Sequence, residues 1–174
     1  AMKENPGDED LTAEEIVNTW AEENLADIIY GYGEERYARR IAKAIVDARA
    51  KKRIQTTGEL VKIIESAVPG LYKRGRIHFA TRTFQALRIA VNDELTTLSK
   101  GIDRGFDALK EGGRMAVITF HSLEDRIVKK FYKQKVEEGG GKLINKKPII
   151  ASDVELKSNA RARSAKLRII EKIK

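Results

Sequence analysis

The chain has 174 residues, of which 41% are hydrophobic and 34% charged, and its formal net charge is +8. This composition is typical of a soluble, charge-rich globular protein rather than a disordered one. The absence of cysteine excludes disulfides and thiolate metal sites and is typical of a reducing compartment. Two histidines are too few for a histidine-built metal site without carboxylate ligands, and no apolar run approaches the roughly 20 residues of a membrane helix.

The charge is distributed unevenly along the chain. Residues 1–35 carry eleven acidic side chains against Lys3, a net charge of −10, so the other 139 residues carry 33 basic and 15 acidic ones, a net charge of +18. We expect residues 1–10 to form an acidic, disordered segment. A strongly basic body is typical of proteins that bind polyanions, nucleic acid above all. The alternative is a solvated surface rich in lysine and arginine.

The first 50 residues predict helices. Thr12 and Glu15 have the spacing of a capping box, which starts a helix. A second, basic helix is expected from about residue 34 to residue 50, after the glycines at 31 and 33. Apolar residues recur in both at helical spacing: Ile16, Val17, Trp20, Tyr37, Ile41, Ala44, Ile45 and Ala48.

Residues 56–110 continue the helical pattern. Thr56 and Glu59 form another capping box, and Pro69-Gly70 ends the helix that it starts. Residues 71–80 predict a basic loop. A long helix is then expected over about Thr81 to Ser99, and a shorter one over about 102–110.

After Gly112-Gly113 the period changes. The short apolar run 114–120 predicts a strand buried on both faces. A helix follows from Ser122 to about residue 135, and weaker strands are expected near 143–150 and 165–173. A strand of this type needs neighbours on both sides, which about three strands can scarcely supply. This region therefore resembles half of a larger sheet.

The fold class predicted from this order is α+β. A helical domain is expected over residues 11–100, followed over residues 101–174 by part of a Rossmann-like lobe with about three strands.

Three strings of residues resemble one family of proteins. They run from His78 to Leu95, from Gly112 to Lys129 and from Asn159 to Arg168, and the string from Tyr32 to Ala42 adds a fourth similarity. In this order they resemble the MraW/RsmH family of bacterial S-adenosylmethionine-dependent methyltransferases. The resemblance covers nearly the whole chain, but only the C-terminal part of the family's roughly 300 residues.

The resemblance implies an activity for the parent protein. Members of the family methylate N4 of a cytidine in small-subunit ribosomal RNA, so we expect part of an rRNA methyltransferase, in the cytoplasm, that is inactive by itself. The family's glycine-rich cofactor loop has no counterpart in this chain. S-adenosylmethionine is therefore expected in the parent protein and no cofactor on this chain. The resemblance also implies a helical insert that recognises RNA.

The candidate RNA-binding residues lie in four places, and the sequence does not assign a catalytic residue or a metal ligand. Guanidinium and ammonium groups suit phosphates, and an imidazole between a strand and a helix suits a base or ribose. The candidates are Lys73, Arg74, Arg76 and His78 in the basic loop; Arg82, Arg88 and Asn92 on the long helix; His121 and Ser122 after the apolar strand; and Arg161 and Arg163 near the C-terminus.

Structural alternatives stay open for these residues. The arginines of the long helix suit a solvated helix surface, and His121 suits a loop whose carbonyls it satisfies. Ser122 is interpreted as a helix N-cap rather than a nucleophile. The basic residues of the last string, Arg168 included, also suit a solvated guard on an edge strand.

Two other functions remain open. One is a stand-alone, non-catalytic module for RNA binding or ribosome assembly, and the other is a helical protein-interaction domain whose basic charge is incidental. Self-association through the exposed partial sheet is a further expectation.

Overall fold

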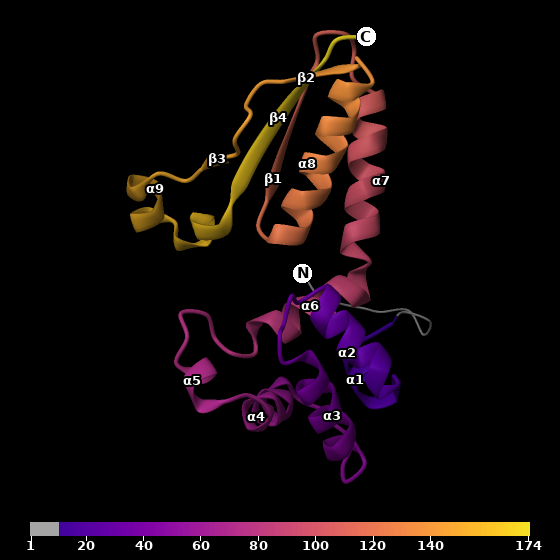
Figure 1. The fold of residues 1–174 in the computed structure, drawn as a ribbon, viewed down its shortest axis with the longest axis vertical. Helices are drawn as coiled ribbons and strands as arrows, with labels where there is room; N and C mark the ends of the chain where they lie inside the picture. Colours follow the sequence, from indigo (N-terminus) through magenta and orange to yellow (C-terminus); the bar gives the residue numbers. More distant parts are fainter. Residues whose placement is uncertain (1–10) are drawn as a thin grey trace. The chain divides into compact units, whose positions relative to one another are not determined.

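The computed structural model describes residues 11–174, so the predicted disordered segment 1–10 lies outside the described residues. The chain forms two compact units that divide between Glu94 and Leu95, and each is described here by itself (Figure 1). None of the described helices is long and apolar enough to cross a bilayer.

The first unit consists of helices whose starts are set by local capping. Thr12 accepts a hydrogen bond from the Glu15 amide at 3.1 Å, and the predicted capping box between Thr56 and Glu59 is complete. The predicted basic helix begins four residues later than expected, at Ala38. The helices are α1 (Ala13–Thr19), α2 (Glu22–Gly31), α3 (Ala38–Arg49), α4 (Thr57–Ala67), α5 (Gly70–Lys73) and α6 (Thr81–Asn92).

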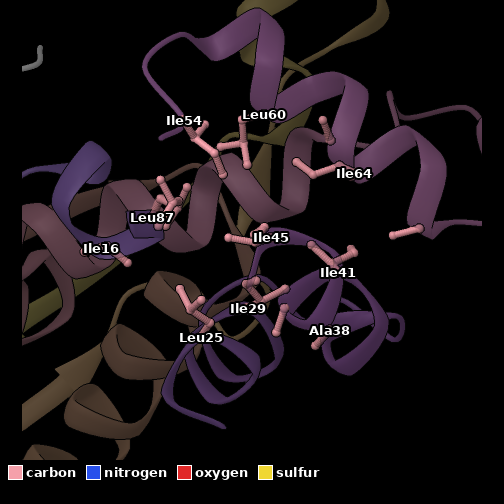
Figure 2. Close-up of a cluster of buried hydrophobic side chains, with 14 of the residues drawn as sticks. Ile16, Leu25, Ile29, Ala38, Ile41, Ile45, Ile54, Leu60, Ile64 and Leu87 are labelled. Atoms are coloured by element: carbon pink, nitrogen blue, oxygen red, sulfur yellow. The ribbon is translucent and has the colours of Figure 1, made fainter. Parts of the chain in front are cut away.

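One apolar core holds these helices together. Figure 2 shows side chains from α1, α2, α3, α4 and α6 converging on it, and each of those labelled is at most 5% exposed. Burying an aliphatic side chain contributes about 1.5–3 kcal/mol, which makes this core the main source of the unit's stability. The labelled residues are Ile16, Leu25, Ile29, Ala38, Ile41, Ile45, Ile54, Leu60, Ile64 and Leu87.

Gly33 lets the end of α2 approach α6 closely. A Cβ atom at this position would lie 2.5 Å from the Ile29 carbonyl oxygen and 2.6 Å from the Arg82 carbonyl oxygen. Any residue with a side chain here would therefore force the two backbones apart. This contact explains the glycine at position 33 in the string from Tyr32 to Ala42.

The predicted long helix over Thr81 to Ser99 is wrong in its extent. Asp93 adopts a left-handed conformation with φ 47°, which ends α6 at Asn92. A new helix, α7 (Glu94–Asp107), then covers residues assigned to two predicted helices. A non-glycine residue in this conformation leaves no signal in the apolar periodicity.

The second unit contains nearly all of α7, followed by a small sheet and further helices. The elements are β1 (Arg114–Thr119), α8 (Ser122–Glu137), β2 (Gly141–Leu143), β3 (Ile149–Ile150), α9 (Asp153–Ser158), the 3-10 helix η1 (Ala160–Ser164) and β4 (Lys166–Lys172).

All pairs in the described sheet are antiparallel, and the last strand lies at its centre. β4 pairs with β1 along its whole length, from Arg114 opposite Glu171 to Thr119 opposite Lys166. On its other side β4 pairs with β2 and with β3. Arg168 is therefore a residue of a central strand and 9% exposed, so the interpretation of this residue as an edge-strand guard is wrong.

Helices α7 and α8 lie side by side against one face of this sheet (Figure 1). The core between them and the sheet contains Phe106 of α7, Val128 and Tyr132 of α8, and Ile170 of β4. Lys135 of α8 reaches the Phe106 ring of α7, with its Nζ 5.5 Å from the ring centroid. The α+β class expected from the sequence is confirmed.

The prediction that β1 is buried on both faces is wrong for this chain. Met115 and Val117 point toward α7 and α8, whereas Ala116 is exposed and Ile118 is 57% exposed. Among the described residues β1 pairs only with β4, so its other edge is open and its second face is uncovered. The apolar composition of β1 suits burial between two layers, but only one of its faces is covered.

Candidate nucleic-acid interface

The basic loop between α4 and α6 is anchored to the helical core through Tyr72. Its hydroxyl donates a hydrogen bond to the Glu35 carboxylate, which is fully buried and also accepts the Tyr37 amide at 2.9 Å. Burial, together with the hydrogen bond to Glu35, raises the pKa of Tyr72 to about 12. The phenol therefore stays protonated and keeps donating, which holds α5 and the residues after it in place.

Arg36 lies over two tyrosine rings. The rings of Tyr37 and Tyr72 meet edge to face, with centroids 5.0 Å apart. The Arg36 guanidinium carbon is 4.8 Å from the Tyr37 centroid and 5.0 Å from the Tyr72 centroid. Such stacking fixes a guanidinium while leaving its N–H groups available, because the ring face provides no hydrogen-bond acceptor in the plane of the cation.

A cavity of about 280 Å³ lies beside this stack. Arginines come to it from three segments, and no carboxylate is found among the described residues that line it. Arg82 is held there by the bond from its Nη1 to the Glu34 carbonyl, at 2.8 Å. A cavity with several guanidinium groups and an aromatic wall attracts an anion, and planar groups can stack on it. Its lining is Arg36, Leu71, Tyr72, Gly75, Arg76, Ile77, His78 and Arg82.

His78 borders a second and larger cavity of about 430 Å³. The His78 ring stacks on Phe79, with centroids 4.2 Å apart, and its Nδ1 accepts the Ala80 amide at 3.3 Å. The cavity has apolar walls and a few polar groups, and its volume is within the usual range for a small organic ligand. Its lining is Val61, His78, Ala80, Thr81, Phe84, Gln85 and Arg88.

The structure thus brings together three of the predicted residues, Arg76, His78 and Arg82. Lys73 and Arg74 are neighbours at the end of α5, outside the cavity lining, and Lys73 lies 3.6 Å from the Glu65 carboxylate. We call the surface formed by Arg36, Tyr72, Arg76, His78 and Arg82 the arginine face.

Arg88 and Asn92 lie together on α6, as their spacing predicts, and make contacts within the protein. Arg88 donates two hydrogen bonds to the Glu94 carboxylate, at 2.8 and 3.0 Å. Asn92 donates to the Arg88 carbonyl at 2.9 Å and to Glu94 at 3.3 Å. These bonds connect the end of α6 to Glu94, so both residues have a structural role here.

In the second unit His121, not Ser122, is the N-cap of α8, which corrects the interpretation of Ser122. His121 Nδ1 accepts the Glu124 amide at 3.4 Å, and Glu124 accepts the amides of Phe120 and His121 at 2.8 and 3.2 Å. Ser122 is the first residue of the helix and is exposed. Arg161 and Arg163 are exposed residues of η1.

Sequence reasoning missed two ion pairs and one stack. Asp125 of α8 accepts two hydrogen bonds from Arg168, at 2.7 and 3.2 Å, and one from Lys166 at 3.3 Å. The hydrogen bond from Arg168 is the main reason that the pKa of Asp125 lies below its usual value. The stack of Arg36 was also missed, although the string that carries Arg36 and Tyr37 had been singled out.

The described residues do not fit S-adenosylmethionine. A strand followed directly by a helix occurs at β1 and α8, where such a cofactor would need glycines and free amides. The connection is Phe120-His121, and the side chains of His121 and Glu124 accept hydrogen bonds from the amides of Phe120, His121 and Glu124. No glycine-rich cofactor loop is found among residues 11–174.

A model of the MraW methylase family matches residues 2–173. The chain belongs to the MraW methylase family. This confirms the resemblance found in the three strings of the sequence.

Several relatives share this similarity. A ribosomal RNA small subunit methyltransferase H from Coprothermobacter proteolyticus is 55% identical over 165 residues, which are 95% of this chain and 54% of the relative. A protein of the same name from Synechocystis is 55% identical over 95% of this chain and 52% of its own length. One from Persephonella marina is 50% identical over 93% and 55%. The chain therefore spans about half the length of the curated relatives it matches.

Proposed function

We propose that this chain is part of an S-adenosylmethionine-dependent methyltransferase that methylates N4 of a cytidine in small-subunit ribosomal RNA. Membership of the MraW methylase family and the names of the relatives support the reaction class and the rRNA substrate. The observation that carries the role of this chain is the arginine face, whose guanidinium groups suit RNA phosphates.

The proposal assigns the arginine face to the RNA backbone and the larger cavity at His78 to an unpaired base. Three guanidinium groups around one cavity match the negative charge of successive phosphates. The apolar wall that includes Phe84 suits the face of a base that has left its stack. The polar side chain of Gln85 suits the edge of the same base. In the same proposal, the loop at His121 borders the target cytidine in the complete protein.

The cofactor-binding part of the enzyme lies outside this chain in the proposal. We therefore predict that the chain alone does not bind S-adenosylmethionine, because its strand-to-helix connection at His121 is closed by its own side chains. Isothermal titration calorimetry of the chain with S-adenosylmethionine checks this prediction. A site of micromolar affinity would contradict it and would place the cofactor on the residues described here.

Complementation tests the proposed activity. The chain is mixed with the part of the Coprothermobacter proteolyticus relative that it does not match, and methyl transfer to small-subunit rRNA is followed with radiolabelled S-adenosylmethionine. We expect methylation of cytidine N4, mapped by mass spectrometry of the digested RNA, only when both pieces are present. Each piece alone serves as the control.

The second candidate function is a non-catalytic module that binds RNA or assists ribosome assembly. The arginine face supports this module as well, because RNA binding by these residues requires no cofactor. Salt-dependent RNA binding, with no methyl transfer in a mixture where both pieces are folded and associated, would support this module over the proposed enzyme.

A further inference from the structure

The second unit carries a basic cavity that shares no lining residue with the two cavities described above. It has a volume of about 160 Å³ and lies where α8, the segment after β2 and the central strand β4 meet. Four of its lining residues are cationic: Lys129 and Lys133 of α8, Lys146, and Arg168 of β4. The others are Tyr132, Leu143 and Asn145.

Hydrogen bonds hold the walls of this cavity in place. The Asn145 side chain donates to the carbonyls of Lys147 and Leu167, at 2.7 and 3.2 Å, and accepts the Ile169 amide at 2.9 Å. These bonds fix the segment that carries Lys146 onto β4. Tyr132 is 1% exposed, and its hydroxyl donates to the Met115 carbonyl at 3.1 Å, which fixes α8. The backbone around the cavity is thus fixed, and Lys129, Lys133 and Lys146 reach it as exposed side chains.

The positive charge around this cavity is only partly balanced. Asp125 is the carboxylate that neutralises Arg168, and it is shared with Lys166. Glu137 lies 3.2 Å from Lys133, but both groups are mainly exposed, so this pair is weak. Among the described residues no carboxylate lines the cavity itself, and no ion pair is found for Lys129 or Lys146.

The size of the cavity limits what it can hold. Its volume is below the roughly 300–1,000 Å³ of pockets that enclose a small organic ligand. A phosphate group is small enough, whereas a nucleoside is not. We infer that Lys129, Lys133 and Lys146 bind a phosphodiester group of the RNA backbone, as a second contact besides the arginine face. This inference rests on the proposed function for its source of phosphate.

Salt-dependent RNA binding tests the inference with the double variant Lys129→Gln/Lys146→Gln. The slope of log affinity against log salt, measured by fluorescence anisotropy on a small-subunit rRNA fragment, should fall by about 0.7, since the site holds one phosphodiester group and each phosphate contact on single-stranded RNA contributes about 0.7. The matched control is Lys51→Gln/Lys62→Gln, which removes two exposed lysines of the first unit and should leave the slope unchanged.

A titration with inorganic phosphate tests the site without RNA. We expect the side-chain NH₂ signals of Asn145 and the Lys146 amide to shift in ¹⁵N-resolved spectra of the whole chain, and the lysine double variant to abolish the shift. RNA binding that depends on the arginine face, with wild-type slope and no phosphate shift at Asn145, would overturn this inference alone. No RNA binding by the wild-type chain would overturn the RNA assignment together with the role proposed for the arginine face.

Discussion

Tyr72 connects the basic loop to the core through one hydrogen bond to a buried charge. Glu35 is fully buried and accepts from Tyr72 and from the Tyr37 amide. A buried carboxylate that loses a donor keeps its full desolvation cost. The position of the arginine face thus depends on a neutral phenol rather than on a charge of its own.

Tyr72→Phe should therefore destabilise the first unit by about 1–3 kcal/mol, because it removes this donor from a buried carboxylate. Urea unfolding followed by the fluorescence of Trp20, the chain's single tryptophan, measures the change. The control is Tyr30→Phe, since Tyr30 is 68% exposed. Equal stability of the two variants would show that Tyr72 does not anchor the loop.

Asp125 has the corresponding role in the second unit. Asp125→Asn should cost about 3–5 kcal/mol because Arg168, 9% exposed, then loses the carboxylate that neutralises it. The folded-state pKa of Asp125 lies below its unfolded value, mainly because Arg168 donates to the carboxylate. The stabilisation is therefore complete above the unfolded pKa of about 3.9 and is lost as the pH falls through the folded pKa.

Hydrogen exchange of α8 amides at several pH values measures this difference, with Asp107→Asn as the control because Asp107 is exposed at the end of α7. The stability difference between wild type and Asp125→Asn should be constant at neutral pH and shrink below about pH 4. A difference that persists unchanged in acid would contradict the role of the carboxylate charge.

At the scale of elements, features set by neighbouring residues were predictable from the sequence, whereas contacts between residues far apart in the chain were not. The capping residues Thr12 and Thr56 each bond an amide three residues ahead, so their spacing alone predicts the helix start. The break at Asp93 rests on one left-handed residue, which periodicity does not report. The Asp125–Arg168 pair joins residues 43 positions apart, and only the pairing of the strands brings them together.

The candidate site shows the same division. The basic loop and its residues Arg76 and His78 were predictable from composition, because lysine and arginine cluster there. The contribution of Arg36 depends on the packing of Tyr37 against Tyr72, which comes from a different part of the chain. Arg168 was interpreted as solvated because its position in a central strand depends on the sheet order.

The outer edge of β1 has no pairing partner among the described residues. Edge strands commonly carry charges that prevent pairing with another chain. The only charged residue of β1 is Arg114 at its start, and Arg114 pairs with Glu171. In a dilute monomer, amides of residues 116–119 should exchange faster than those of residues 86–91 in α6.

At higher concentration we expect self-association through this edge, measured by light scattering. Ile118→Lys places a charge on the edge strand and should weaken association, whereas Val154→Lys in α9, where Val154 is 77% exposed, should not. Equal amide protection in β1 and α6, with no dimer at any concentration, would show that the sheet has no available edge.

At the scale of the whole molecule, the central claim is that this chain binds ribosomal RNA through the arginine face. The +18 charge of residues 36–174 is compatible with several anionic partners. The arginine face is more specific, because it combines guanidinium groups, an aromatic wall and an adjacent cavity of about 430 Å³. The arginine face therefore distinguishes RNA binding from a helical protein-interaction domain better than the net charge does.

The most direct test is the affinity of the whole chain for a decoding-region fragment of small-subunit rRNA, measured by fluorescence anisotropy at about 50 and 200 mM salt. With about six phosphate contacts, the wild type should lose on the order of 10³-fold in affinity between these salt concentrations. Arg36→Gln/Arg76→Gln should bind more weakly and with a smaller salt dependence, whereas the control Arg53→Gln/Arg104→Gln should match the wild type. Affinity that is independent of salt, or an arginine-face variant that binds like the control, would contradict the account.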